Sequence, residues 1–279
     1  MKKFLCLFLV SLSVMAQEQS TTGPESGNLV IAGGGAIGQD ITNTFINLAG
    51  GKNATIVVIP TAGGQDTYDD DVWFAKQLRD YGCTRVTVLH TYDRTMADSD
   101  EFTLALKEAT GVWFSGGRQW RLVDAYAGTE TERVFWEVLD KGGVIGGTSA
   151  GATIQGSYLV RGDTQTNQIM MGDHEEGFGF VKNIAIDQHV LARNRQFDMF
   201  EILEKRPELL GIGLDESTAI VVHQNTFEVI GESNVLIYDG NFWSRDTNDV
   251  AHPPNIERPF YFLQKGDLYD LRERKVITN

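Results

Sequence analysis

The stretch that decides the fold of this chain is Val144-Ile145-Gly146-Gly147-Thr148-Ser149-Ala150-Gly151-Ala152. It is a short apolar run that contains Gly-x-Ser-x-Gly, with Ser149 between Gly147 and Gly151. This spacing is typical of a sharp strand-to-helix turn, where a strained backbone pushes the serine oxygen outward and neighbouring side chains would collide. The helix that follows would offer free N–H groups and a positive dipole end beside the hydroxyl. The same pattern also fits a tight connection without a catalytic role.

Apolar strands and amphipathic helices alternate along the chain up to this turn. The expected strands are 28–32, 54–59, 85–89, 111–114 and 143–146, and the expected helices are 39–49, 69–81, 98–108 and 129–141. This alternation predicts an α/β fold with a doubly wound, mostly parallel sheet and helices on both faces. Ligands of such sheets bind beyond the carboxyl ends of the strands, where the glycine-rich loops of this chain lie.

The last third of the chain has a different pattern. A strand candidate at 184–186 and a helix expected over 194–204 precede a series of short apolar segments separated by turn residues. These segments are 219–223, 226–230, 234–238, 260–263 and 268–271. We therefore expect a C-terminal antiparallel β annex on the edge of the sheet.

The N-terminus is typical of a secretory signal. Lys2 and Lys3 precede the apolar segment 4–10, and Val14-Met15-Ala16 supplies small residues at the usual cleavage spacing. Residues 1–16 are therefore predicted to be a signal peptide. Residues 17–27 are polar and unpatterned and predict a flexible leader, followed by a single domain over 28–279. No later run approaches the roughly 18 apolar residues of a membrane span. We expect an exported protein, periplasmic or extracellular.

Composition narrows the classes of partner. The chain has 279 residues, 42% of them hydrophobic, which is enough for a full core. Its formal net charge of −14 becomes −16 if Lys2 and Lys3 are removed, and such a surface repels nucleic acid and anionic membranes. Acidity would suit a cationic substrate, but it is also an ordinary route to solubility. Cys83 would be the one cysteine left, which excludes an internal disulfide and a cysteine-based metal cluster.

Gly33-Gly34-Gly35-Ala36-Ile37-Gly38 formally matches the dinucleotide fingerprint Gly-x-Gly-x-x-Gly after a strand. The acidic residue expected at the end of the second strand is missing, since Pro60-Thr61-Ala62 stands there. Export also argues against a diffusible nicotinamide cofactor. We therefore expect a structural or substrate-facing turn, and no cofactor.

A serine nucleophile needs a base and a carboxylate that orients the base. His189 fits the base, because the strand candidate 184–186 leads directly into Asp187-Gln188-His189. The other histidines, expected to be structural or surface residues, are His90, His174, His223 and His252. Asp215 and Glu216 follow a short apolar segment at 211–214 and supply carboxylates at another strand end. The order serine, histidine, acid differs from that of α/β-hydrolases.

These motifs together resemble the cyanophycinase family of serine peptidases, whose relatives include aspartyl dipeptidases of peptidase E type. The resemblance rests on three ordered segments and runs from about residue 28 to the C-terminus. They are Gly147-Thr148-Ser149-Ala150-Gly151-Ala152, Asp187-Gln188-His189 with Arg193 and Arg195, and Gly213-Leu214-Asp215-Glu216. The family's fold is similar to the class I glutamine amidotransferase core.

The resemblance implies roles for named residues. Ser149 would be the nucleophile, His189 the base and Glu216 the orienting acid. Ser115-Gly116-Gly117-Arg118-Gln119 matches a family loop, and N–H groups of Gly116, Gly117 and Ala150 could form an oxyanion hole. The substrate-binding residues would be Gln119, Asp187, Gln188, Arg193 and Arg195. No metal is implied, and a homodimer is possible.

Two departures from the family pattern concern the substrate. The position of a third arginine is occupied by Asp198, and Arg118 stands where relatives often carry an acidic or amide residue. Arginine forks bind carboxylates in a bidentate manner, so Asp198 would remove a donor and add repulsion toward a carboxylate substrate.

The leading hypothesis is therefore an exported serine exopeptidase that cleaves Asp-containing peptide or isopeptide bonds, with cyanophycin as the first candidate substrate. One alternative is an Asp-specific dipeptidase of peptidase E type. Another is a non-catalytic ligand- or nucleotide-binding module in which Ser149 is only a turn residue.

Overall fold

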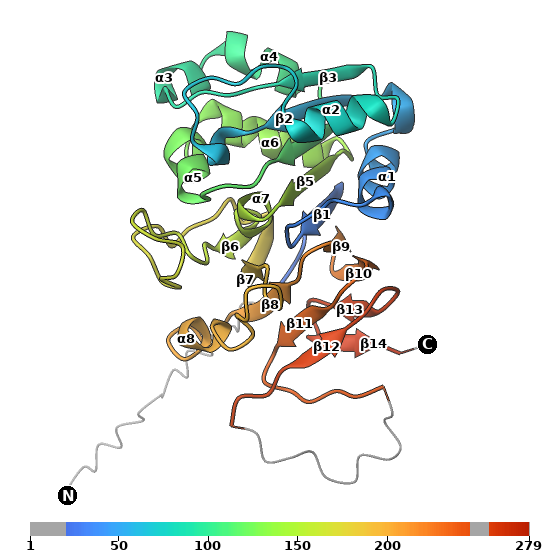
Figure 1. Cartoon of the computed structure of the whole chain (residues 1–279), viewed down its shortest axis with the longest axis vertical. Helices are drawn as coiled ribbons and strands as arrows, with labels where there is room; N and C mark the ends of the chain where they lie inside the picture. Colours follow the sequence, from blue (N-terminus) through green and yellow to red (C-terminus); the bar gives the residue numbers. More distant parts are fainter. Residues whose placement is uncertain (1–20, 246–256, 279) are drawn as a thin grey trace, which may run out of the picture.

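A computed structural model describes residues 21–245 and 257–278 (Figure 1). Its larger sheet has nine strands in the order β14-β13-β10-β9-β1-β5-β4-β2-β3. The parallel half consists of β1 (Asn28–Ala32), β5 (Val144–Thr148), β4 (Gly111–Phe114), β2 (Thr55–Ile59) and β3 (Arg85–Val88). Strand β5 pairs with β1 on one side and β4 on the other, so the Ser149 turn follows an interior strand of the sheet.

Helices cover both faces of the parallel half, as predicted (Figure 1). On one face lie α1 (Gln39–Leu48) and α2 (Trp73–Asp80); on the other lie α3 (Arg94–Ala97), α4 (Asp100–Lys107), α5 (Trp120–Tyr126) and α6 (Glu130–Asp140). Short 3₁₀ turns at Gly51–Asn53 and Thr61–Gly63 follow α1 and β2. Strand β4 shows the alternation, because Trp113 stacks on Phe74 on the first face while Phe114 contacts Phe135 of α6 on the second. The doubly wound sheet is confirmed.

The predicted antiparallel annex extends the same sheet beyond β1, but the expected segments 234–238 and 260–263 are not part of it and belong to a second sheet. The annex consists of β9 (Thr218–His223), β10 (Thr226–Gly231), β13 (Leu268–Asp270) and β14 (Lys275–Ile277). Strand β9 runs antiparallel to β1 along Leu29–Ala32. The glycine loop after β1 therefore lies between the end of β5 and the start of β9.

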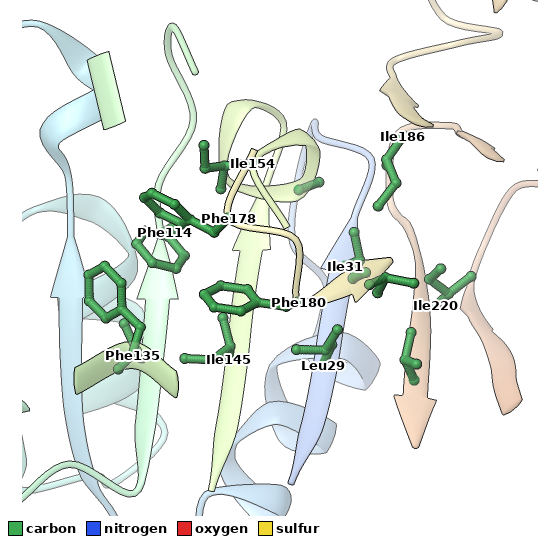
Figure 2. Packing of buried hydrophobic residues seen from close by; sticks show 14 of the residues in the cluster. Leu29, Ile31, Phe114, Phe135, Ile145, Ile154, Phe178, Phe180, Ile186 and Ile220 are labelled. Carbon is green, nitrogen blue, oxygen red and sulfur yellow. The ribbon is translucent and has the colours of Figure 1, made fainter. Parts of the chain in front are cut away.

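A second sheet, which the sequence did not predict as separate, packs against the α4–α6 face. Its strands are β6 (Gly156–Tyr158), β7 (Val181–Gln188), β8 (Leu210–Leu214), β11 (Val235–Tyr238) and β12 (Tyr261–Leu263), in the order β12-β11-β8-β7-β6. Strands β6, β7 and β8 are parallel to one another. Figure 2 shows Phe178 and Phe180 packed beside Phe114, Phe135 and Ile145, which joins the two sheets in one apolar core. Apolar strand patterns do not reveal which sheet a strand joins.

Two segments differ from the sequence-based expectation. The helix expected over 194–204 is reduced to α8 (Met199–Leu203), because the preceding residues form turns such as the Arg195 N–H donating to the Val190 carbonyl at 2.6 Å. Residues 21–27 are packed rather than flexible: Thr21 is buried, and the Thr22 and Lys182 backbones exchange hydrogen bonds of 3.3 and 2.8 Å. The packing of this segment could not be predicted, because a polar segment held by backbone hydrogen bonds shows no hydrophobic periodicity in its sequence. The predicted signal peptide (1–16) and the rest of the leader (17–20) lie outside the described residues.

Candidate active site

Three strand ends bring a hydroxyl, an imidazole and a carboxylate together. Ser149 follows β5, His189 follows β7 and Glu216 follows β8. The Ser149 Oγ lies 2.9 Å from His189 Nε2, and His189 Nδ1 lies 2.5 Å from Glu216 Oε1. The three predicted triad residues thus form one hydrogen-bonded chain, the arrangement in which an imidazole can accept a hydroxyl proton while a carboxylate orients it.

The Ser149 turn has the strained backbone that its glycines predicted. Ser149 has φ 56° and ψ −112° and directly precedes the short helix α7 (Ala150–Thr153). A Cβ at Gly147 would lie 2.2 Å from the Gly151 carbonyl oxygen, and a Cβ at Gly151 would lie 2.1 Å from that of Phe114. A side chain at either position would clash with these backbone atoms. Glycine at both positions therefore allows the turn after β5 to pack closely between the ends of β1 and β4.

The environment of His189 keeps its imidazole neutral. Its side chain is only 8% exposed, and this burial lowers its pKa below the ordinary value. The hydrogen bond from Nδ1 to Glu216 opposes the shift, whereas the positive charges of Arg193 and Arg195 add to it. A neutral ring with Nδ1–H bound to Glu216 leaves Nε2 free to accept a proton from Ser149.

The glycine loop after β1 supports the triad. The Gly33 carbonyl accepts the His189 N–H at 3.0 Å, and the Gly34 carbonyl accepts the Ser217 N–H at 2.9 Å. A Cβ at Gly34, where φ is 122°, would lie 2.1 Å from the His189 ring, and one at Gly35 would lie 2.8 Å from the Glu216 side chain. The segment that formally matches the dinucleotide motif therefore packs against His189 and Glu216 and supports them. Its position at a strand end beside β5 was the signal that could have revealed this.

Asp215, the other carboxylate of the pair, fixes the segment that follows His189. Its Oδ1 accepts the N–H groups of Leu191 and Ala192 at 3.1 and 2.9 Å, and its Oδ2 accepts the Ser233 hydroxyl at 2.6 Å. All of these contacts lie away from the imidazole. The adjacent carboxylates thus have separate tasks, and Glu216 is the one that reaches the imidazole.

The predicted oxyanion donors lie around Ser149. Gly116 is so close that a Cβ built on it would be 3.3 Å from Ser149 Cβ, and Gly117, at φ 144°, packs against the Ala62 carbonyl. The neighbouring Ser115 and Arg118 N–H groups donate to Ile59 and Ala62. Within the described residues, the N–H groups of Gly116, Gly117 and Ala150 have no such acceptor.

A comparison with known protein families matches residues 29–230 to the family described as Peptidase family S51. The chain belongs to peptidase family S51. It is therefore a serine-type peptidase, and the resemblance to cyanophycinases is confirmed.

Curated relatives of this S51 peptidase include two cyanophycinases. That of Synechococcus elongatus is 32% identical over 274 residues, which cover 92% of this chain and 84% of the relative. That of Geminocystis herdmanii (strain PCC 6308) is 32% identical over 251 residues, which cover 86% and 91%. The crystal structure of a peptidase from an acI-B1 Actinobacterium has the same fold, with a TM-score of 0.65 at 24% identity over 88% of this chain and 97% of that one.

The predicted substrate-binding residues of the peptidase differ in accessibility. Arg193 is exposed beside the triad, whereas Arg195 is buried and donates to the Gln188 carbonyl at 3.3 Å. The buried Gln119 amide donates to the Val160 and Arg161 carbonyls at 2.5 and 2.8 Å, which fixes the chain after β6. Of these residues, Arg193 is the most accessible to a ligand.

Arg161 is a residue of this region that the sequence did not reveal. Its side chain is fully buried and donates from Nε and Nη2 to the two oxygens of Asp187, both at 2.9 Å. Nη2 also donates to Asp198 Oδ2 at 2.7 Å. Asp187 is thus occupied by an internal ion pair, and Asp198 neutralises an arginine of the protein. No motif marks Arg161, because the pairing joins segments distant in sequence.

The second departure from the family pattern, Arg118, points to a neighbouring loop. Its guanidinium donates to the carbonyls of Asp163 and Thr166. Arg118 thereby holds the segment after Arg161, and its side chain is engaged within the protein.

The other histidines make separate contacts. His90 Nδ1 lies 2.9 Å from Thr61 Oγ1, His174 Nε2 lies 2.8 Å from Asp124 Oδ1, and His223 Nδ1 lies 3.0 Å from Asn28 Oδ1. His252 lies outside the described residues. Over 21–245 and 257–278, no three His, Cys, Asp or Glu side chains are grouped as metal ligands, and no helix has the length and apolarity to cross a bilayer.

Proposed function

We propose that this peptidase is an exported serine exopeptidase that hydrolyses Asp-containing peptide or isopeptide bonds, with the release of β-Asp-Arg dipeptides from cyanophycin as its first candidate reaction. The observation that carries the proposal is the hydrogen-bonded chain Ser149–His189–Glu216. Membership of family S51 and the cyanophycinases among the relatives support the choice of substrate.

In the proposed reaction, Ser149 Oγ attacks the scissile carbonyl carbon while His189 Nε2 takes the hydroxyl proton. The C–N bond then breaks, and the imidazolium gives its proton to the leaving amine. A water molecule attacks the acyl-enzyme in the same way, returning the proton to Ser149 and releasing the acid. Glu216 stabilises the imidazolium that forms in both halves.

Negative charge that develops on the carbonyl oxygen would be held by the N–H groups of Gly116, Gly117 and Ala150. Their freedom from internal acceptors supports this role, since an oxyanion hole needs donors that are already in place. Removal of one such donor from a comparable site costs about 10²- to 10³-fold in kcat.

Arg193, together with Arg195, would attract a carboxylate of the substrate. Arg193 is suited to direct contact, while Arg195, Gln119, Asp187 and Gln188 would shape the site from beneath. Because Arg161 is committed to Asp187 and Asp198, it is not available as a further carboxylate ligand. With one carboxylate ligand fewer, the site could prefer a smaller substrate than cyanophycin. Small Asp-linked peptides should therefore be tested as well, and a preference for these peptides would indicate a dipeptidase of peptidase E type.

The proposal of export rests on the signal-peptide pattern of residues 1–16. N-terminal sequencing of the protein secreted or released from the periplasm is expected to begin at Gln17. A mature protein that begins at Met1 and stays in the cytosol would contradict export without touching the catalytic proposal. The homodimer remains a prediction from the resemblance, to be tested by light scattering.

The catalytic proposal is tested with a serine-directed phosphonate and peptide mapping. An activated nucleophile is expected to be labelled at Ser149, and a Glu216→Gln variant more slowly. No label at Ser149 on a folded protein would favour the binding module, because a turn hydroxyl without a base does not react.

A further inference from the structure

A cavity of about 540 Å³ lies beside the nucleophile, between the loop after β2 and the end of β4. Gly116 and Ser115 form its inner edge, and Gly116 is the residue whose Cβ would stand 3.3 Å from Ser149 Cβ. The outer wall comes from the segment that leads into α2, including Tyr68, Asp69 and Trp73. A substrate held at Ser149 can therefore extend a neighbouring side chain into this cavity.

The outer wall is aromatic and acidic. Trp73 is 54% exposed although it begins helix α2, and Tyr68 stands near it in the same wall. Asp69 is the one charged residue among the lining residues, all of which are described. Arg121 approaches Gly64 nearby, but it donates to the Ala62 carbonyl at 3.0 Å and stacks on Trp120.

The wall is held in place by its own contacts. The Tyr68 hydroxyl accepts the Gln65 N–H at 3.1 Å, and its ring meets the His90 ring edge-on at 4.9 Å. Asp69 Oδ1 accepts the Asp71 N–H at 3.0 Å. The wall is thus preorganised, and among the described residues Asp69 forms no ion pair. An exposed indole and such a carboxylate in one cavity are the combination that binds an organic cation by cation–π and charge attraction.

We propose that this cavity is a subsite for a cationic side chain of the substrate, a guanidinium or an ammonium, which stacks on Trp73 and pairs with Asp69. The inference rests on the proposed peptidase function and identifies the residues that select the substrate's side chain. Arg193, which lies outside this cavity, would select a carboxylate, so the two subsites together favour a zwitterionic substrate.

The first test compares two substrates that differ in charge alone. A trimer of β-Asp-Arg and the matching trimer of β-Asp-citrulline have nearly the same shape, but the ureido group of citrulline is neutral. We expect wild type to hydrolyse the arginine trimer with a kcat/KM at least tenfold higher. Asp69→Asn and Trp73→Ala should each lower kcat/KM for the arginine trimer about five- to tenfold and leave that for the citrulline trimer within twofold.

Asp70→Asn is the matched control. Asp70 is exposed on the same segment and its loss changes the net charge equally, but it does not line the cavity. We expect an effect below twofold on either substrate. Equal losses in Asp69→Asn and Asp70→Asn, or equal losses on both trimers, would overturn the subsite.

A binding measurement separates this inference from the proposed reaction. Titration of wild type with Nα-acetyl-argininamide should quench tryptophan fluorescence, and Trp73→Phe should reduce the quench. Nα-acetyl-citrullinamide, which is neutral, should bind at least fivefold more weakly, and Asp69→Asn should remove the difference. This result without hydrolysis of either trimer would sustain the subsite and refute the cyanophycin proposal; hydrolysis of both trimers at equal rates, or equal binding of both amides, would refute the subsite alone.

Discussion

At the residue scale, His189 is the proposed base, so its pKa is expected to set the lower limit of the peptidase's pH range. Burial lowers this pKa, and the active form of a general base is the deprotonated one. The acid limb of kcat/KM should therefore have its midpoint below the ordinary histidine value of about 6.5. A pH–rate profile measures this midpoint, and one clearly above 6.5 would contradict the environment described for His189.

Arg193 offers a way to move the same midpoint. Its positive charge disfavours the imidazolium, so Arg193→Gln should raise the pKa of His189 and shift the acid limb to higher pH, by a few tenths of a unit for an exposed charge. Lys141→Gln, between α6 and the amino end of β5, is the matched control and should leave the midpoint unchanged. An effect of Arg193→Gln on KM alone would assign it to substrate binding only.

Arg161 illustrates a residue whose loss should act on stability. Arg161→Met would leave Asp187 as a buried charge without a partner, which costs about 3–5 kcal/mol of the free energy of unfolding. Adding Asp187→Asn should recover part of this loss, because it removes the stranded charge. Urea unfolding measures both; a single variant within about 1 kcal/mol of wild type would show that the pair has little role in stability.

At the scale of elements, the site is made by the carboxyl ends of β1, β5, β7 and β8. The sequence indicated that Ser149, His189 and Glu216 each follow a strand, because each of them comes after an apolar run. It could not indicate that β7 and β8 belong to a second sheet, since that depends on which faces pack together. The contact between Gly34 and His189 was missed for the same reason.

Gly34→Ala tests that contact. The substitution introduces a Cβ at positive φ and within 2.1 Å of the His189 ring, so the imidazole must leave the position in which it bonds Ser149 and Glu216. Small misplacements of a catalytic group can cost about a hundredfold in rate, and we expect at least that loss in kcat.

Gly50→Ala is the matched control for Gly34→Ala. Gly50 also has a positive φ, 108°, but a Cβ there meets nothing within 4 Å. Backbone strain should cost each variant about 1–2 kcal/mol of stability. Gly34→Ala should lose more than this because of its contact with the His189 ring, and only Gly34→Ala should lose activity. Equal activities in the two variants would show that the glycine loop does not support the triad.

At the scale of the whole molecule, the two sheets share one core. The segment 21–27 precedes β1 and pairs with Lys182 of β7. Composition and alternation were sufficient to predict the α/β class and the antiparallel edge. They were insufficient for this segment, because Thr21 and Thr22 are held by backbone pairing and by Arg274, whose guanidinium donates to Thr21 Oγ1 at 2.8 Å. Such long-range polar contacts leave no periodic signal.

Two truncated proteins test the role of this segment. Chains that begin at Gln17 and at residue 21 both keep the segment 21–27 and are the references. A chain that begins at Asn28 loses several hydrogen bonds worth about 1 kcal/mol each, so it should be about 3 kcal/mol less stable. Thermal unfolding of the three proteins decides this, and identical midpoints would return residues 21–27 to the flexible leader.

The most direct test of the proposed function is hydrolysis of insoluble cyanophycin by purified wild type and by Ser149→Ala, with a panel of α- and β-linked Asp dipeptides run beside it. We expect that wild type releases β-Asp-Arg and that Ser149→Ala, at an unchanged unfolding temperature, loses about 10⁴-fold or more in rate. Activity on other Asp-linked peptides alone would retain the triad and change the substrate. A Ser149→Ala variant that keeps more than a tenth of the wild-type rate would contradict the role of Ser149 as the nucleophile.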